Sequence, residues 1–90
     1  MKKSDEFFDQ LEAQLIALTT MTSPLLGVNE KDVTDFIDVG EYGLALETLC
    51  DILFETQKKV PIQNYALIVR IGETMKLNSR IWEKLQVELA

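Results

Sequence analysis

Apolar residues recur at every third or fourth position near the start of the chain, which is the spacing of one helix face. This face consists of Phe7, Phe8, Leu11, Leu15, Leu18 and Met21. Ser4 is a favourable N-cap residue, and the acidic residues after it suit the positive end of a helix dipole. The pattern predicts a helix from Ser4 to about Met21. We expect it to end within segment 22–27, because this segment contains Pro24 and Gly27.

A short second helix is predicted between Asn29 and Gly40. Asn29 is a favourable N-cap residue, and Asp32 takes the third helical position, where it can stand in for the acidic residue of a capping box. The apolar face of this helix is Val33, Phe36 and Ile37. Gly40 is expected to end the helix in the left-handed conformation.

The segment 41–58 is predicted to form the central helix. Its apolar residues leave only a narrow polar stripe, which is typical of a helix inside a bundle. These residues are Tyr42, Leu44, Ala45, Leu46, Leu49, Cys50, Ile52, Leu53 and Phe54. The polar residues Glu47, Asp51, Glu55 and Lys58 follow one another at spacings of four, four and three, so we expect them to share one exposed edge.

Two further helices complete the pattern. Pro61 fits the first turn of the fourth helix, which should end near Leu77 and bury Tyr65, Ile68, Val69, Gly72 and Met75. The fifth helix is expected to start at Asn78-Ser79 and to carry Ile81, Trp82, Leu85 and Leu89. We find no alternating strand pattern. The sequence therefore predicts an all-α fold, a compact single-domain bundle of about five helices over residues 1–90.

The length and the cysteine content fit this interpretation. Ninety residues allow one domain, and a single cysteine excludes an intramolecular disulfide bond. The start of the chain lacks the apolar run of a signal peptide, and no segment reaches the roughly 20 apolar residues of a membrane span. We therefore expect a soluble, cytoplasmic protein that does not engage a membrane.

Charge is distributed unevenly along the chain. Residues 1–57 hold twelve acidic residues against three lysines, whereas residues 58–90 hold six basic residues against three acidic ones. Such an acidic segment argues against direct nucleic-acid binding, because phosphates require a basic surface. It favours a basic protein partner. The simpler alternative is that the charge only keeps a small protein soluble.

The residues that catalysis commonly uses are scarce in this sequence. The chain has no histidine, which removes the commonest general base and zinc ligand. Cys50 has apolar and acidic neighbours, whereas a nucleophilic cysteine needs electropositive ones. Gly40 and Gly43 do not form a phosphate-binding pattern, and we expect Gly43 to permit close helix packing instead. We therefore predict no catalytic residue, no metal and no cofactor.

The acidic residues remain as candidates for partner binding. Three of them recur every third residue in the second helix, one follows at the junction, and three continue along the third helix. They are Asp32, Asp35, Asp38, Glu41, Glu47, Asp51 and Glu55. If the edges of the two helices face the same side, these residues form one extended anionic surface. The alternative is a solvated surface that contacts nothing.

The central segment also carries a family resemblance. Residues 39–55 read VGEYGLALETLCDILFE, and this segment resembles the hallmark segment of the MafI-type immunity proteins. The similarity extends more weakly over residues 28–85. It implies a small helical antitoxin of a bacterial polymorphic toxin system, including the systems of contact-dependent growth inhibition. Such a protein would bind its cognate toxin domain one to one, and that domain would commonly be a basic nuclease such as an RNase.

Two other functions remain open from the sequence. The chain could be a small acidic helical adaptor that binds a regulatory protein, or an enzyme that uses its carboxylates. In the immunity protein, the acidic residues would cover either the active site of the toxin or an adjacent basic exosite. The hallmark segment supplies mainly core positions, so we expect it to mark the fold and the acidic residues to form the interface.

Overall fold

The computed structural model describes residues 5–89 of the chain, and the predicted cap at Ser4 lies outside this range. In chain order the elements are α1 (Asp5–Leu26), the 3₁₀ turn η1 (Gly27–Asn29), α2 (Glu30–Asp38), α3 (Tyr42–Thr56), β1 (Val60–Pro61), α4 (Ile62–Thr74), α5 (Arg80–Glu83) and β2 (Val87–Glu88). The predicted all-α fold is confirmed.

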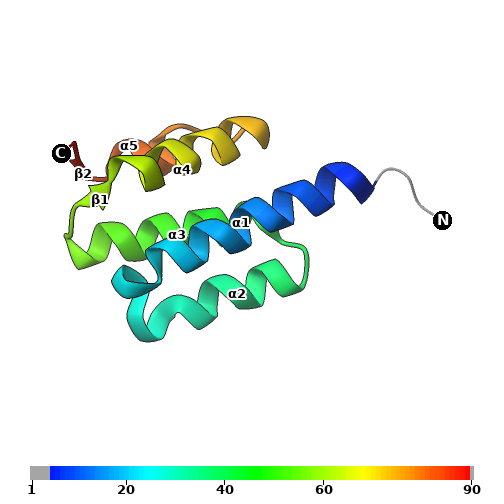
Figure 1. Cartoon of the computed structure of the whole chain (residues 1–90), viewed down its shortest axis with the longest axis horizontal. Coiled ribbons are helices and arrows are strands. Elements are labelled where there is room, and N and C mark those ends of the chain that lie inside the picture. The colour runs from blue at the N-terminus through cyan, green and yellow to red at the C-terminus, as the bar shows by residue number, and fades with distance from the viewer. Residues whose placement is uncertain (1–4, 90) are drawn as a thin grey trace.

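The helices form layers around α3. Helices α1 and α3 lie side by side in the middle of the molecule, α2 packs against both on one side, and α4 and α5 cover the other side (Figure 1). The largest fully buried side chains come from all of these layers: Leu15, Leu18, Leu26, Val33, Leu46, Leu49, Leu53, Val60, Ile68 and Ile71. Each one contributes about 1.5–3 kcal/mol by leaving water, and α3 alone contributes six buried residues, as the sequence predicts for a central helix.

Helix α1 is longer than predicted, because it continues through Pro24 to Leu26. Proline leaves the carbonyl of Thr20 without its helical partner, but Thr20 is exposed, so water can take that place. The buried positions Thr22 and Leu26 continue the apolar face beyond Met21, and this burial holds the last turns in place. The helix ends only at Gly27, which adopts a left-handed conformation with φ 59°.

The two ends of α2 differ in how well the sequence predicts them. The side chain of Asn29 does not cap the helix, because η1 leads straight into α2 and gives Asn29 a helical backbone. The predicted capping box of Asn29 and Asp32 therefore does not form. At the other end Gly40 has φ 80°, and the N–H groups of Gly40 and Glu41 donate to the carbonyls of Ile37 (3.0 Å) and Phe36 (2.9 Å). This is a Schellman motif, which confirms the predicted left-handed cap.

Helix α4 ends at Thr74, where Trp82 of α5 packs against it. A Cβ atom at Gly72 would lie 2.6 Å from Cη2 and 2.8 Å from Cε3 of Trp82, and closer still to Cζ3. Only glycine therefore lets the indole ring rest on α4. Gly43 is different, because a Cβ atom there would meet only Leu77, at an ordinary distance of 3.8 Å. The expectation that Gly43 permits close packing is wrong, and Gly72 has that role.

The C-terminal segment does not form the long fifth helix predicted from the sequence. Helix α5 spans a single turn, after which the chain forms β2 and pairs in parallel with β1. Val60 lies opposite Val87, and its N–H donates to the carbonyl of Gln86 at 2.8 Å. Leu89 is exposed beyond this pair. Two-residue strands are too short to show the alternation that predicts a strand, so the sequence pattern could not reveal them.

Candidate protein-binding surface

All seven acidic residues predicted to bind a partner are exposed. Asp32, Asp35 and Asp38 lie on α2, Glu41 lies at the junction of α2 and α3, and Glu47, Asp51 and Glu55 lie on α3. Among these carboxylates, the described structure gives ion pairs only to Asp35 and Asp51. Most of the predicted charge is thus presented to solvent.

On α2 the carboxylates wind around the helix and do not form a straight ridge. A step of three residues turns by about 60° around the axis, so Asp32 and Asp38 lie about 120° apart. Asp38 lies on the α1 side, where it lines a shallow groove of about 90 Å³ together with Ile16 of α1. Asp35 accepts a hydrogen bond of 2.9 Å from Nζ of Lys31, and this contact raises the pKa of Lys31.

On α3 the polar edge faces α5. Lys84 follows α5 directly, and its Nζ donates to Oδ1 of Asp51. The same Nζ lies 5.2 Å from the centroid of the Phe54 ring, which is half exposed on this edge. Lys84 thus binds a carboxylate and an aromatic ring at once. Glu47 and Glu55 lie one turn to either side of Asp51 and extend the edge in both directions.

The structure therefore does not place the seven carboxylates on one common edge. Asp38 faces the groove beside α1, whereas Asp51 faces α5 on the other side of α3. The expectation of a single shared side is replaced by an anionic surface in two parts, one around α2 and one on the edge of α3 that faces α5. Helices α4 and α5 lie on the side of the molecule away from α2 (Figure 1). The basic residues Lys58 and Lys59 precede these two helices in the chain.

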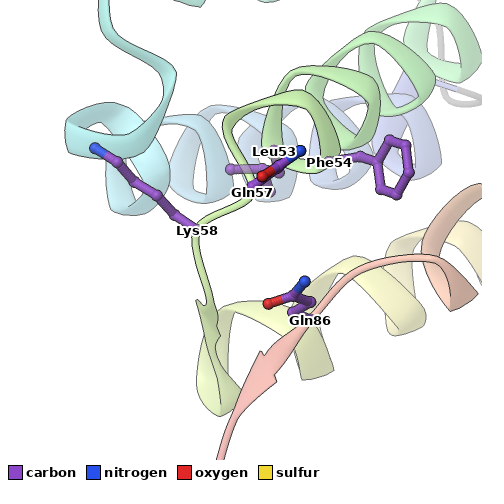
Figure 2. Close-up of a pocket in the computed structure, with 5 residues that line it drawn as sticks. All are labelled: Leu53, Phe54, Gln57, Lys58 and Gln86. Atoms are coloured by element: carbon purple, nitrogen blue, oxygen red, sulfur yellow. The ribbon is translucent and has the colours of Figure 1, made fainter.

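Three hollows on the surface of residues 5–89 are small, and the groove beside Asp38 is one of them. One of about 120 Å³ is lined by Leu53, Phe54, Gln57, Lys58 and Gln86. Figure 2 shows Gln86 across from the end of α3, while Lys58 extends away from it. Another hollow, of about 240 Å³, lies beside Pro61 and Glu88. Small-molecule sites usually have about 300–1,000 Å³, so these hollows fit small side chains of a partner better than a ligand.

The thiol of Cys50 is buried inside the core. Burial, together with the acidic Asp51 and Glu47, raises its pKa to about 12, although Lys84 acts in the opposite direction. A thiol in this state is a poor nucleophile at neutral pH. Within residues 5–89, no three histidine, cysteine or acidic side chains are grouped so as to hold a metal ion.

An aromatic cluster at the start of α1 was not predicted as a surface feature. Phe7 and Phe8 belong to the apolar face of α1, yet they are 50% and 51% exposed. Their rings meet edge to face with centroids 5.1 Å apart, and the Phe8 ring lies 6.5 Å from that of Tyr42. The N-terminal turns of α1 extend past the ends of α2 and α4, so this part of the face has few helices to cover it (Figure 1).

The lengths of the predicted helices give a signal of this exposure, because the first is predicted from Ser4 to about Met21 and the second only between Asn29 and Gly40. In the structure the difference is larger, since α1 has 22 residues and α2 has nine. At about 1.5 Å per residue, α1 must extend beyond a partner of that length. Met21 of the same predicted face is also exposed.

The fold and the surface together define a small all-α domain whose exposed carboxylates gather on its first three helices. None of the helices in residues 5–89 has both the length and the apolar character needed to cross a membrane. Comparison of the chain with protein-family models, with curated proteins and with solved structures gives no match. The resemblance of residues 39–55 to the MafI-type immunity proteins therefore stays a prediction.

Proposed function

We propose that this chain is an immunity protein, which binds the toxin domain of a bacterial polymorphic toxin one to one and neutralises it. The toxin domain that fits best is a basic nuclease of the RNase class. The observation that carries the proposal is the anionic surface of α2 and α3, on which all seven selected carboxylates are exposed. A nuclease needs a basic surface to hold phosphates, and carboxylates bind the same arginine and lysine side chains.

The resemblance of residues 39–55 supports the same assignment. This segment covers most of α3, whose six buried residues hold the bundle together. The resemblance therefore concerns residues that maintain the fold. Recognition of the partner then depends on the exposed residues of the helices. A complex of this kind would bury about 1,200–2,000 Å² in total.

Co-expression with the toxin domain encoded immediately upstream tests the proposal. We expect the chain to restore growth of cells that produce this domain and to co-purify with it at a ratio of one to one. If the chain neither restores growth nor co-purifies, the proposal fails. Co-purification with a regulatory protein in its place would favour the adaptor function.

Charge variants locate the interface. The triple variant Asp32→Asn/Asp35→Asn/Asp38→Asn should weaken toxin binding by about tenfold or more, because it removes charges that face the partner. The matched control is Glu73→Gln/Glu83→Gln/Glu88→Gln, which makes the same change in net charge on the elements around α4 and α5. Equal affinities of the two variants would show that only net charge matters and that α2 is not in the interface.

A competition experiment separates the two modes of inhibition. A non-cleavable oligonucleotide should displace the chain from the toxin domain if the carboxylates occupy the phosphate sites of the active site. If the chain binds an adjacent exosite, the oligonucleotide and the chain should bind together. Fluorescence anisotropy of the labelled oligonucleotide distinguishes the two outcomes.

A further inference from the structure

We propose that the aromatic cluster of Phe7, Phe8 and Tyr42, bordered by Asp9 and Glu12, is a docking site for an arginine side chain of the basic partner. This inference rests on the proposed function for the identity of the partner. The chemistry of the site, however, can be tested without it.

The first argument is that the apolar face of α1 is buried along most of the helix but remains exposed at its N-terminal turn. Counting from Leu15, which is fully buried, Phe8 lies seven residues back and therefore on the same side of the helix. The stripe that forms the core thus continues into the N-terminal turn, where it is half exposed. Two adjacent phenylalanine rings exposed to this degree represent apolar area that a partner can cover.

The second argument is the charge around the rings. On the next turn of α1, Asp9 is exposed and Glu12 is half-buried. Glu12 follows Phe8 by four residues and therefore lies one turn away on the same side of α1. Burial and the negative charges of Glu12 and Asp9 raise the pKa of Tyr42, which agrees with this placement. Carboxylates and aromatic faces therefore meet where the start of α1 passes the start of α3.

The third argument comes from an example within the same molecule. Lys84 lies over the Phe54 ring and binds the carboxylate of Asp51, so one cation uses a ring and an acid together. The cluster at Phe7, Phe8 and Tyr42 offers the same two kinds of group. Arginine suits it best, because the planar guanidinium group stacks on aromatic rings and binds carboxylates through two parallel hydrogen bonds.

The charge of the site also distinguishes between two kinds of binding partner, a second copy of this chain and a basic protein. In a two-fold symmetric dimer formed through this cluster, a second copy would bring its own Asp9 and Glu12 against these carboxylates, and like charges in contact oppose association. A basic partner gains from the same carboxylates. We therefore assign the site to a basic protein and not to a homodimer contact.

A peptide titration tests the chemistry of the site directly. The full chain, labelled with ¹⁵N, is titrated with a ten-residue peptide of alternating arginine and glycine, and separately with the matched lysine peptide. We expect amide shifts to concentrate at residues 7–12 and 41–43, with the arginine peptide bound about threefold more tightly. Shifts spread evenly over α2 and α3, or equal affinities for the two peptides, would overturn the proposal.

Variants tie these shifts to the aromatic rings. Phe7→Ala/Phe8→Ala should remove the preference for arginine and weaken binding of the toxin domain about tenfold. The control Met21→Ala/Val28→Ala removes exposed apolar side chains outside the cluster, and we expect it to change the affinity by less than about twofold. Thermal unfolding establishes that each variant is folded. Asp9→Asn/Glu12→Gln keeps the rings, so it should weaken binding of both peptides and reduce the preference for arginine without abolishing it.

The outcomes separate this inference from the proposed function. If the toxin domain binds the wild-type chain and Phe7→Ala/Phe8→Ala with equal affinity, the docking site is wrong and the immunity function stands. If the toxin domain does not bind the wild-type chain at all, the immunity function is wrong. The peptide titration then decides by itself whether the cluster binds arginine.

Discussion

At the scale of single residues, Gly72 shows how one missing side chain fixes the packing of two elements. The six-membered ring of Trp82 occupies the space that a Cβ atom of Gly72 would need. Trp82 is itself buried and belongs to the core. The contact therefore joins α4 to α5 at a point where no larger residue fits.

Gly72→Ala should lower the free energy of unfolding by about 2–3 kcal/mol, because the indole ring must move out of its site. Helix propensity alone would favour alanine by about 1 kcal/mol, so a loss of stability identifies the contact with Trp82 as the cause. Urea unfolding measures the difference. Gly43→Ala is the matched control in α3 and should be neutral or stabilising, since its Cβ atom has room.

The buried thiol of Cys50 should make stability depend on pH in the alkaline range. Its pKa is about 12 in the folded chain against an ordinary value of 9.0. The folded state thus keeps the proton that the unfolded state releases, and stability falls as the pH rises above about 9.

The loss should amount to about 1 kcal/mol for each pH unit between 9 and 11. Because other groups also titrate there, the measurement is the difference in unfolding free energy between the wild type and Cys50→Ala across this range. A difference that does not change with pH would show that the thiol titrates normally in the folded chain.

Glycines also show how far single residues could be predicted. Gly40 was predicted correctly, since the left-handed end of a helix is a local conformation that depends on a few neighbouring residues. Gly72 was predicted only to lie on a buried face. Its actual role depends on where Trp82 comes to rest, and that is decided by the packing of two separate elements.

At the scale of elements, α1 illustrates competition between local and tertiary effects. Pro24 predicts an end to the helix, but Leu26 is buried two residues later and the helix includes both. A proline inside a helix costs about 3 kcal/mol, and less near an end where fewer hydrogen bonds are affected. Burial of Leu26 is of similar size and opposes this cost.

Pro24→Ala should therefore stabilise the protein by about 1–2 kcal/mol, because alanine restores an N–H donor for the Thr20 carbonyl. The shift of the urea midpoint at unchanged slope measures the effect. Ser23→Ala serves as a control, since it alters a neighbouring side chain that hydrogen-bonds to Glu30 without changing the backbone. A destabilised Pro24→Ala variant would show that proline is needed to set the end of α1.

The C-terminal elements show that the spacing of apolar residues does not reveal where a helix ends and a strand begins. Ile81, Trp82 and Leu85 have helical spacing, and the structure does bury Trp82 and Leu85. The helix nevertheless ends at Glu83, because the chain turns to place β2 beside β1. Burial was thus predicted better than conformation at these positions.

At the scale of the whole molecule, the uneven charge of the sequence becomes an uneven surface. Most acidic residues belong to the segment that forms α1, α2 and α3, whereas most basic residues belong to the segment that forms α4 and α5. Helices α4 and α5 lie on the side of the molecule away from α2 (Figure 1). Such a charge distribution orients a basic partner before contact and accelerates its association.

Association with the basic toxin domain should therefore slow by about tenfold or more when the salt concentration rises from about 0.05 to 0.5 M. The dissociation rate should change much less, since contacts formed in the complex are short and partly dehydrated. Stopped-flow fluorescence measures both rates. An association rate that does not depend on salt would argue against electrostatic recognition by α2 and α3.

The candidate surface was predicted in part. Exposure of the seven carboxylates follows from their position opposite the apolar positions of each helix, and the structure agrees. Their relative arrangement does not follow, because it depends on how α2 and α3 rotate when they pack. The pairing of Asp51 with Lys84, 33 residues away, is a consequence of that packing.

The sequence by itself determined the helical class, the position of α3 at the centre and the separation of acidic from basic segments. These properties depend on local spacing and on composition, which do not change when the chain folds. The tertiary structure alone decided which parts of each apolar face remain uncovered and which charges become neighbours. Exposure of Phe7 and Phe8 is the clearest case, because a residue is buried only if another element reaches it, and α1 extends past the helices that cover the rest of its face.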